Sequence, residues 1–171
     1  MISFLGASLI LFSTSWMGFA MAKKVKERPK QLRELKVALQ SLEAEIMYGH
    51  VPLDEAFGHL SRQLNEPIAA FFGELAGALQ ETASSVPILW EEALTRLAER
   101  SSLKKAELEV LQQFGSTLGR HDRDNQKRHI QLTLSHLERE LDEATAAVAT
   151  YEKLYKSVGV LSGLLLIILL I

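Results

Sequence analysis

Apolar residues near the C-terminal end of the chain recur at alternating steps of four and three positions. A repeat of this kind is typical of a long helix that buries one stripe against a neighbouring helix. The sequence therefore predicts a helix of about 30 residues that can continue into the apolar tail. The repeat consists of Ile130, Leu134, Leu137, Leu141, Ala144, Val148, Tyr151 and Tyr155.

A second segment of the same kind lies earlier in the chain. Pro29 suits its first helical turn, and Gly49 is placed to end it. Both long helices adjoin an apolar end of the chain, so we expect them to lie side by side, with shorter helices packed away from the membrane. The apolar positions of this segment are Leu32, Leu35, Leu39, Leu42 and Ile46.

Between these segments, turn residues divide the chain into four shorter helices. Pro52 begins the first, Asn65-Glu66-Pro67 separates it from the second, and Ser101-Ser102 is the predicted cap of the fourth. Signals for β-strands are nearly absent. The predicted fold class is all-α: an antiparallel helical bundle of about six helices between an N-terminal and a short C-terminal transmembrane helix. The four shorter helices are expected at 52–64, 67–79, 88–99 and 103–118.

Charge placement excludes several classes of protein. Every charged side chain lies between Lys23 and Lys156, and the formal net charge is −2. This balance argues against a general nucleic-acid binder. The chain has no cysteine, which excludes a disulfide scaffold and a thiolate metal site.

The first apolar end, 1–22, is long enough as a helix to cross a bilayer. A cleaved signal peptide is the alternative, because Ala20-Met21-Ala22 resembles a cleavage site. However, no basic residue precedes the apolar stretch, and seven Lys or Arg residues follow it between Lys23 and Lys36. This pattern favours a retained anchor, with Met1 outside and the body in the cytosol. The same basic residues can also hold anionic lipid headgroups.

The second apolar end, 157–171, has only 15 residues. It can span a thinned bilayer, insert halfway, or be buried against a partner. The predicted organisation is thus a transmembrane anchor at 1–22, a basic juxtamembrane linker at 23–30, a cytosolic helical bundle at 31–156 and a C-terminal membrane segment at 157–171.

The middle of the chain is strongly acidic. Between Glu43 and Glu99 there are ten Asp or Glu residues, and only Arg62 and Arg96 oppose them. These acids form either a solvated face that avoids anionic lipid or a docking face for a basic cytosolic partner.

No motif for catalysis, cofactor binding or metal binding is present. A phosphate-binding loop, a nucleophile elbow and a His-Glu-x-x-His sequence are all missing. Gly115 and Gly119 close a helix and indicate turn geometry. His129 and His136 lie about 10 Å apart along one helix, which is too far to share a metal ion. The sequence predicts no catalytic, cofactor-binding or metal-ligating residue, no cofactor, and a protein that is not an enzyme.

Several strings together resemble the stage III sporulation protein AB family of endospore-forming bacteria, from end to end of the chain and in the same order and spacing. They are Arg28-Pro29-x-Gln31-Leu32-Arg33, Leu39-Gln40-Ser41-Leu42-Glu43-x-Glu45-Ile46-x-Tyr48-Gly49, Pro52-Leu53-x-Glu55-Ala56, Phe114-Gly115-x-x-Leu118-Gly119-x-x-Asp122-x-x-x-Gln126 and Gly159-Val160-Leu161-x-Gly163.

This resemblance implies a non-enzymatic membrane scaffold of the channel complex that joins the mother cell and the forespore. That family is similar in fold to the cytoplasmic domains of type II secretion platform proteins. The implied location is the mother-cell side of the outer forespore membrane, with the soluble domain in the mother-cell cytoplasm. The implied partners are other stage III A channel proteins, especially the AA ATPase, and the lipid bilayer, with a homo-oligomer as a further possibility. No catalytic residue carries over from the family.

Physical chemistry gives several matching positions a structural role. Gly49 and Gly119 can adopt positive φ at helix ends, and Asp122 can cap the last helix. The alternative function is a membrane-bound signalling protein whose long helix transmits a signal. A small membrane enzyme would need a convergent polar cluster in the bundle.

Overall fold

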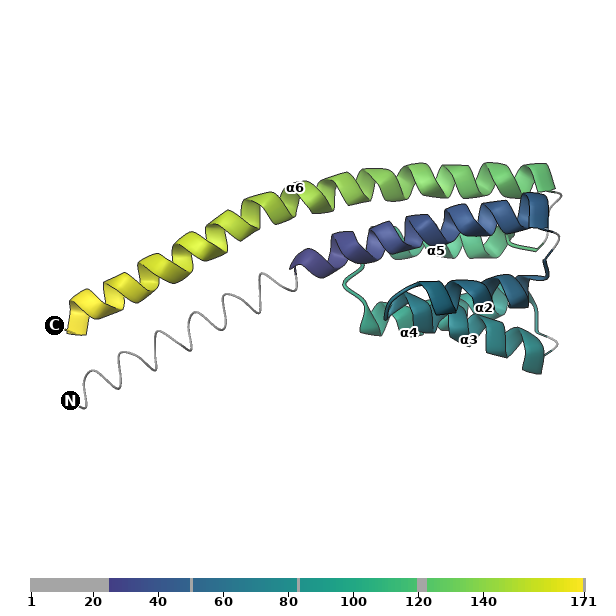
Figure 1. The fold of residues 1–171 in the computed structure, drawn as a ribbon, viewed down its shortest axis with the longest axis horizontal. Helices are drawn as coiled ribbons and strands as arrows, with labels where there is room; N and C mark the ends of the chain where they lie inside the picture. The colour runs from purple at the N-terminus through teal and green to yellow at the C-terminus, as the bar shows by residue number, and fades with distance from the viewer. Residues whose placement is uncertain (1–24, 50, 83, 120–122, 171) are drawn as a thin grey trace. The chain divides into compact units, whose positions relative to one another are not determined.

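The computed structural model describes residues 25–49, 51–82, 84–119 and 123–170 (Figure 1). The described residues contain helices and the loops between them and no β-strand, so the all-α prediction is confirmed. An α-helix over residues 25–44 leads without a break into the π-helical turn η1. The elements in order are η1 (Glu45–Gly49), α2 (Leu53–Gln63), α3 (Ile68–Glu81), α4 (Val86–Arg100), α5 (Lys105–Thr117) and α6 (Arg123–Leu170).

The chain forms two compact units. The larger, which we call the bundle unit, is Lys30–Asp142. The smaller, the terminal unit, combines Met1–Pro29 with Glu143–Ile171. Most described side chains belong to the bundle unit, which contains α2 to α5 and the first part of α6.

In the bundle unit, the segment 30–44 runs antiparallel to α6 (Figure 1). Lys36 pairs with Glu138, and seven residues later Glu43 accepts a hydrogen bond of 3.2 Å from Gln131. A step of seven residues along one helix thus matches a step of seven back along the other, which is the register of an antiparallel helix pair. The prediction that the two long helices lie side by side is confirmed.

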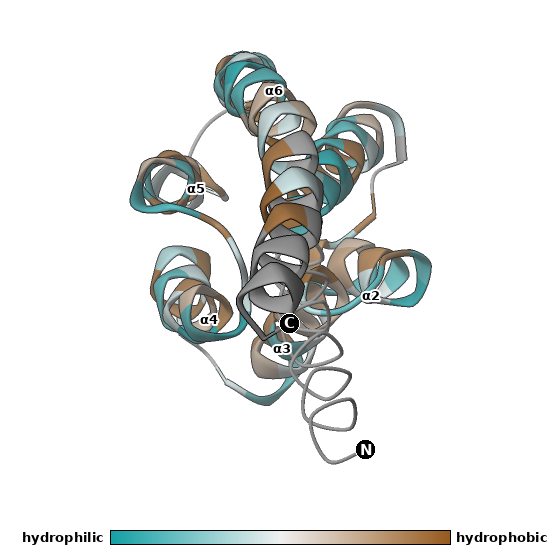
Figure 2. Cartoon of the chain, turned by 90° about the vertical axis from the view of Figure 1, so that its left-hand side faces the viewer, coloured by the Kyte–Doolittle hydropathy of each residue, from teal (hydrophilic) through white to brown (hydrophobic). Residues whose placement is uncertain are grey.

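Most described members of the apolar repeats face the interior as predicted, but Tyr151 is exposed. Leu32, Leu35, Leu39 and Leu42 are almost wholly buried, and Ile46 is half-buried. On α6 the buried members of the repeat are Ile130, Leu137, Leu141 and Ala144. Viewed end-on, the helices carry hydrophilic residues on their outer faces (Figure 2).

Two helix starts differ from the sequence prediction. Residues 25–28 are already helical, so the helix runs through Pro29 instead of beginning there. The predicted cap Ser101-Ser102 is wrong: Ser101 ends α4, and α5 begins at Lys105. The start of α5 is capped from inside the helix, because the Glu107 carboxylate accepts a hydrogen bond from the Lys104 backbone N–H.

An aromatic cluster fills the centre of α2, α3, α4 and α5. The Trp90 ring lies 4.9 Å from Phe71 and 5.4 Å from Phe114, both edge to face. Its indole N–H donates a 2.9 Å hydrogen bond to the Leu111 carbonyl, so the polar end of the buried ring is satisfied. The cluster consists of Phe57, Phe71, Phe72, Trp90 and Phe114.

Gly115 lets Trp90 approach α5. A Cβ atom on Gly115 would lie only 2.0 Å from Trp90 Cδ1, so this glycine is required by packing. The sequence-based prediction that Gly115 serves turn geometry is therefore wrong. Gly119, four residues later, does have the positive φ expected of a helix end, at 78°.

The membrane predictions fall largely outside this description. The predicted anchor at 1–22 and the predicted cap Asp122 are not among the described residues. The predicted C-terminal membrane segment is helical as far as Leu170, as part of α6. No described helix meets the combined length and hydropathy that crossing a bilayer requires.

Candidate docking surface

The ten acids between Glu43 and Glu99 do not form one continuous acidic face. Four of the carboxylates already contact polar side chains of neighbouring helices, at different helix pairs. Glu91, for example, accepts a 3.2 Å hydrogen bond from Gln112 of α5. The exposed members of the set are Glu55, Glu66, Glu81, Glu91, Glu92 and Glu99.

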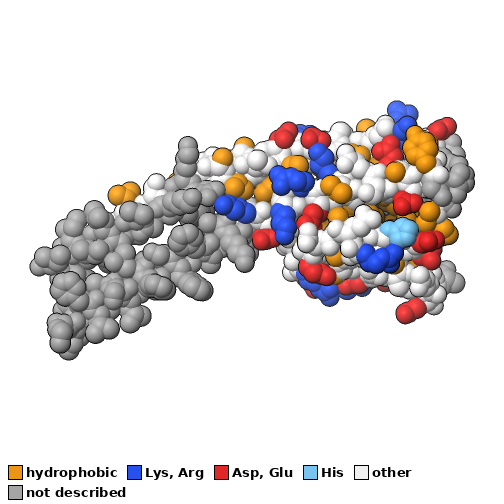
Figure 3. All heavy atoms as spheres, viewed as in Figure 1, with side chains coloured by type: hydrophobic (Ala, Val, Ile, Leu, Met, Phe, Trp, Pro, Cys, Tyr) orange, Lys and Arg blue, Asp and Glu red, His pale blue; other side chains and the backbone are white. Residues whose placement is uncertain are grey.

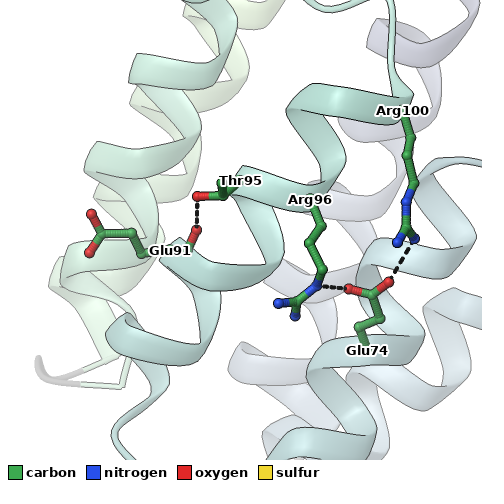
Figure 4. A network of polar contacts seen from close by, with 5 residues as sticks. All are labelled: Glu74, Glu91, Thr95, Arg96 and Arg100. Carbon is green, nitrogen blue, oxygen red and sulfur yellow. Dashed lines mark hydrogen bonds and ion pairs between the residues drawn. The ribbon is translucent and has the colours of Figure 1, made fainter.

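Glu74 on α3 joins two arginines of α4 (Figure 4). Its carboxylate oxygens accept hydrogen bonds from Arg96 Nε at 2.5 Å and Arg100 Nη1 at 2.9 Å. Burial of Glu74 opposes ionisation, but the hydrogen bonds and positive charges of the two arginines outweigh it and lower the pKa of Glu74. This carboxylate therefore holds α3 against α4 and is not available to a partner.

His59 lies between two carboxylates at the start of the acidic region. Its Nδ1 is 3.6 Å from Glu45 and its Nε2 is 3.9 Å from Glu55, the residue one turn earlier on α2. At these distances both contacts are ion pairs only in the protonated form of the imidazole. His59 thus links η1 to α2.

A groove of about 540 Å³ runs between α2 and α3 beside His59. Its lining combines small residues with polar and charged side chains. Figure 3 shows acidic and basic side chains interspersed on the side of the bundle where α2 lies. The groove is lined by Asp54, Glu55, Gly58, His59, Ser61, Arg62, Gly73, Ala76, Gly77 and Gln80.

The described histidines do not belong to any group of side chains that could hold a metal ion. His129 is half-buried and His136 is exposed on α6. Within the described ranges, no three His, Asp or Glu side chains come together as metal ligands. His50 and His121 lie outside those ranges.

The burial of four polar residues, Arg28, Gln31, Glu107 and Thr133, was not predicted from the sequence. Gln31 accepts a 2.8 Å hydrogen bond from the Ser102 backbone N–H and so fixes the loop between α4 and α5. In the terminal unit, Arg28 pairs with Glu143 at 3.4 Å. Glu107 is fully buried at the start of α5. Arg28 and Gln31 stand in one of the strings that carry the family resemblance, so that string was the available signal.

Arg28 and Gln31 are buried just before the apolar repeat, which begins at Leu32. A buried Gln or Arg is tolerated only when its polar atoms are bonded. All buried side-chain nitrogen and oxygen atoms in the described residues have a hydrogen-bond partner.

Comparison with known proteins agrees with this architecture. The family model for Stage III sporulation protein AB matches residues 3–171. Stage III sporulation protein AB of Bacillus subtilis (strain 168) is 49% identical over 170 residues, covering 99% of each chain. A solved structure of Stage III sporulation protein AB covers 72% of this chain and 97% of its own, with a TM-score of 0.69 and 47% identity.

The fold and its surface define an all-helical bundle protein with a grooved, mixed-charge exterior. The end-to-end sequence match is more specific than the fold. The chain belongs to the stage III sporulation protein AB family.

Proposed function

We propose that this protein is a non-enzymatic membrane scaffold of the mother cell–forespore channel complex needed for endospore formation. In this proposal both ends of the chain attach to the membrane, and the bundle unit docks a secretion-type ATPase on the mother-cell side. The names of the relatives support the role in sporulation.

One observation carries the membrane attachment: an exposed apolar row on the last part of α6. Leu154, Val158 and Leu161 are 53%, 54% and 63% exposed, and their spacing of four and three residues puts them on one helix face. Transfer of an apolar row of this kind out of water lowers the free energy. The first part of the same helix belongs to the bundle unit, so insertion of the row tethers that unit to the membrane.

The terminal unit supports attachment at both ends. Arg28 is bonded to Glu143, so the chain segments that lead to the two apolar ends are adjacent there. The basic residues from Lys23 to Lys36 favour a cytoplasmic position for this part of the chain.

Two experiments test the proposal. Protease added to intact protoplasts of sporulating cells should leave the 51–119 region uncut, and should cut it after permeabilisation. Vesicles that carry the full chain should bind the purified stage III AA ATPase, and vesicles without the chain should not. Digestion from outside would contradict the orientation, and equal binding to both vesicle types would contradict the docking role.

The alternative is a membrane-bound signalling protein, and the unbroken α6 favours it. This helix runs for 48 residues without interruption and so can transmit a rotation or a shift along its axis. Helix-breaking insertions separate the two functions. If the protein is a scaffold, a variant with a flexible Gly-Ser insertion after Ala149 should retain both ATPase binding and sporulation. If α6 transmits a signal, the same variant should still bind the ATPase but no longer support sporulation.

A further inference from the structure

The groove between α2 and α3 contains glycines that the fold itself does not require. A Cβ atom on Gly77 would meet nothing within 4 Å, and one on Gly58 would meet only the flexible end of Arg62, at 3.6 Å. Neither residue has the positive φ that favours glycine. Each is inside a helix, where glycine is less favourable than alanine. Unlike Gly115, these two glycines lower helix stability without an internal packing reason.

Bare backbone in a groove allows close approach by another helix. Small residues let helix backbones come together and increase van der Waals contact. A Cβ atom on Gly73 would lie 3.5 Å from Ser61 Cβ on the facing helix, which is ordinary van der Waals contact, so packing between α2 and α3 does not require that glycine either. Gly58 and Gly77 leave the outer side of the same helix pair open.

The charge at one end of the groove indicates the sign of the occupant. Asp54 and Glu55 line the groove from the first turn of α2. Within the described residues, the Asp54 carboxylate has no ion pair, and Glu55 has only His59 at 3.9 Å. Arg62 lines the groove about two turns further along α2, so the two ends of the groove differ in charge.

We propose that this groove docks a helix of a protein partner whose basic residues lie over Asp54 and Glu55. The inference rests on the proposed docking function and names the place and chemistry of the contact. The docked helix packs its backbone against Gly58 and Gly77, and its opposite end lies over Arg62.

The test uses variants of the full chain in which the groove is filled or its charge is reversed. Binding of the purified stage III AA ATPase to vesicles that carry each variant is then measured. Gly77→Leu fills the floor, and the double variant Asp54→Lys/Glu55→Lys reverses the charge. Ala106→Leu on α5 and Glu92→Lys/Glu99→Lys on α4 are the matched controls, because all three positions are exposed and outside the groove. Each groove variant should weaken binding at least tenfold, and each control should change it less than twofold. Thermal unfolding should show that Gly77→Leu remains folded.

Sporulation provides a readout that does not depend on the identity of the partner. Gly77→Leu should lower the yield of heat-resistant spores at least a hundredfold at equal protein level, and Ala106→Leu should not. If the ATPase binds and the groove variants bind equally well, the groove inference is overturned while the docking function stands. If the ATPase never binds but Gly77→Leu alone prevents sporulation, the ATPase proposal fails and the groove is supported.

The other candidate occupant of the groove is a second copy of this chain, and a measurement of self-association tests for it. If Gly77→Leu changes the oligomeric state measured by sedimentation in detergent, the groove receives a second copy of this chain. That result would overturn the assignment of a basic partner helix.

Discussion

The contact between α4 and α5 and the groove between α2 and α3 both contain helical glycines, but for different reasons. At Gly115 a side chain would collide with Trp90, so the internal packing determines the residue. At Gly77 a side chain would have free space. The comparison shows that a glycine within a helix indicates a docking surface only where packing inside the protein does not require it.

The largest expected effect is at the aromatic cluster. Trp90→Ala removes the ring that contacts four phenylalanines and leaves a cavity, so it should lower the free energy of unfolding by about 3–5 kcal/mol. Urea unfolding followed by circular dichroism measures the change. A loss below about 1 kcal/mol would mean that the cluster is not the centre of the fold.

Gly115→Ala should be the next largest. The added methyl group forces Trp90 out of place and should cost about 1–3 kcal/mol. The cost should largely disappear when Trp90 is replaced by Leu, because the collision is specific to the indole ring. Equal costs in the two backgrounds would show that the glycine is needed for another reason.

Gln31→Ala leaves the Ser102 N–H without its acceptor. The expected cost is about 1–2 kcal/mol, since that N–H is partly buried. Gln40→Ala, on the exposed side of the same helix, is the control and should change the free energy of unfolding little. If the two variants behave alike, the bond from Gln31 does not hold the loop.

Gly77→Ala should act in the opposite direction and stabilise the protein. The expected gain is at most about 1 kcal/mol, from the better helix propensity of alanine. Gly115→Ala in the same assay provides the contrast. Destabilisation by Gly77→Ala would show that the interior does require this glycine and would remove the reason for the groove proposal.

The smallest expected effect is the pH dependence contributed by Glu74. Its folded pKa lies below the usual pKa of a glutamate, so its stabilising contribution is present above that usual pKa and is lost as the pH falls through the folded pKa. The arginines are partly exposed, so this contribution should be about 0.2–1 kcal/mol. Glu74→Gln should flatten the stability profile in that acidic window, whereas Glu81→Gln on the exposed end of α3 should not.

The sequence was sufficient for the helices because their apolar positions repeat regularly. The four leucines between Leu32 and Leu42 are buried as their spacing predicts, and Pro52 and Gly119 mark helix ends. The start of α5 was missed because its cap comes from Glu107, three residues inside the helix, and not from a preceding serine. Serine is favoured as a residue that caps a helix start, but here the buried Glu107 carboxylate accepts the capping hydrogen bond.

The candidate site was harder to predict from the sequence. A sum of charges between Glu43 and Glu99 cannot reveal that Glu74 is bonded to Arg96 and Arg100, because those contacts join separate helices. The groove likewise depends on which faces of α2 and α3 remain open after packing. The acidic character of the region was visible in the sequence, whereas the position at which it can act was not.

The most direct test of the docking account is site-specific photo-cross-linking in sporulating cells. A photoreactive residue at position 77 in the groove, where a side chain has free space, is compared with one at the exposed position 113 on α5. The account predicts a cross-link to the stage III AA ATPase from position 77 and none from position 113. Cross-links to the ATPase from position 113 alone, or from neither position, would contradict it.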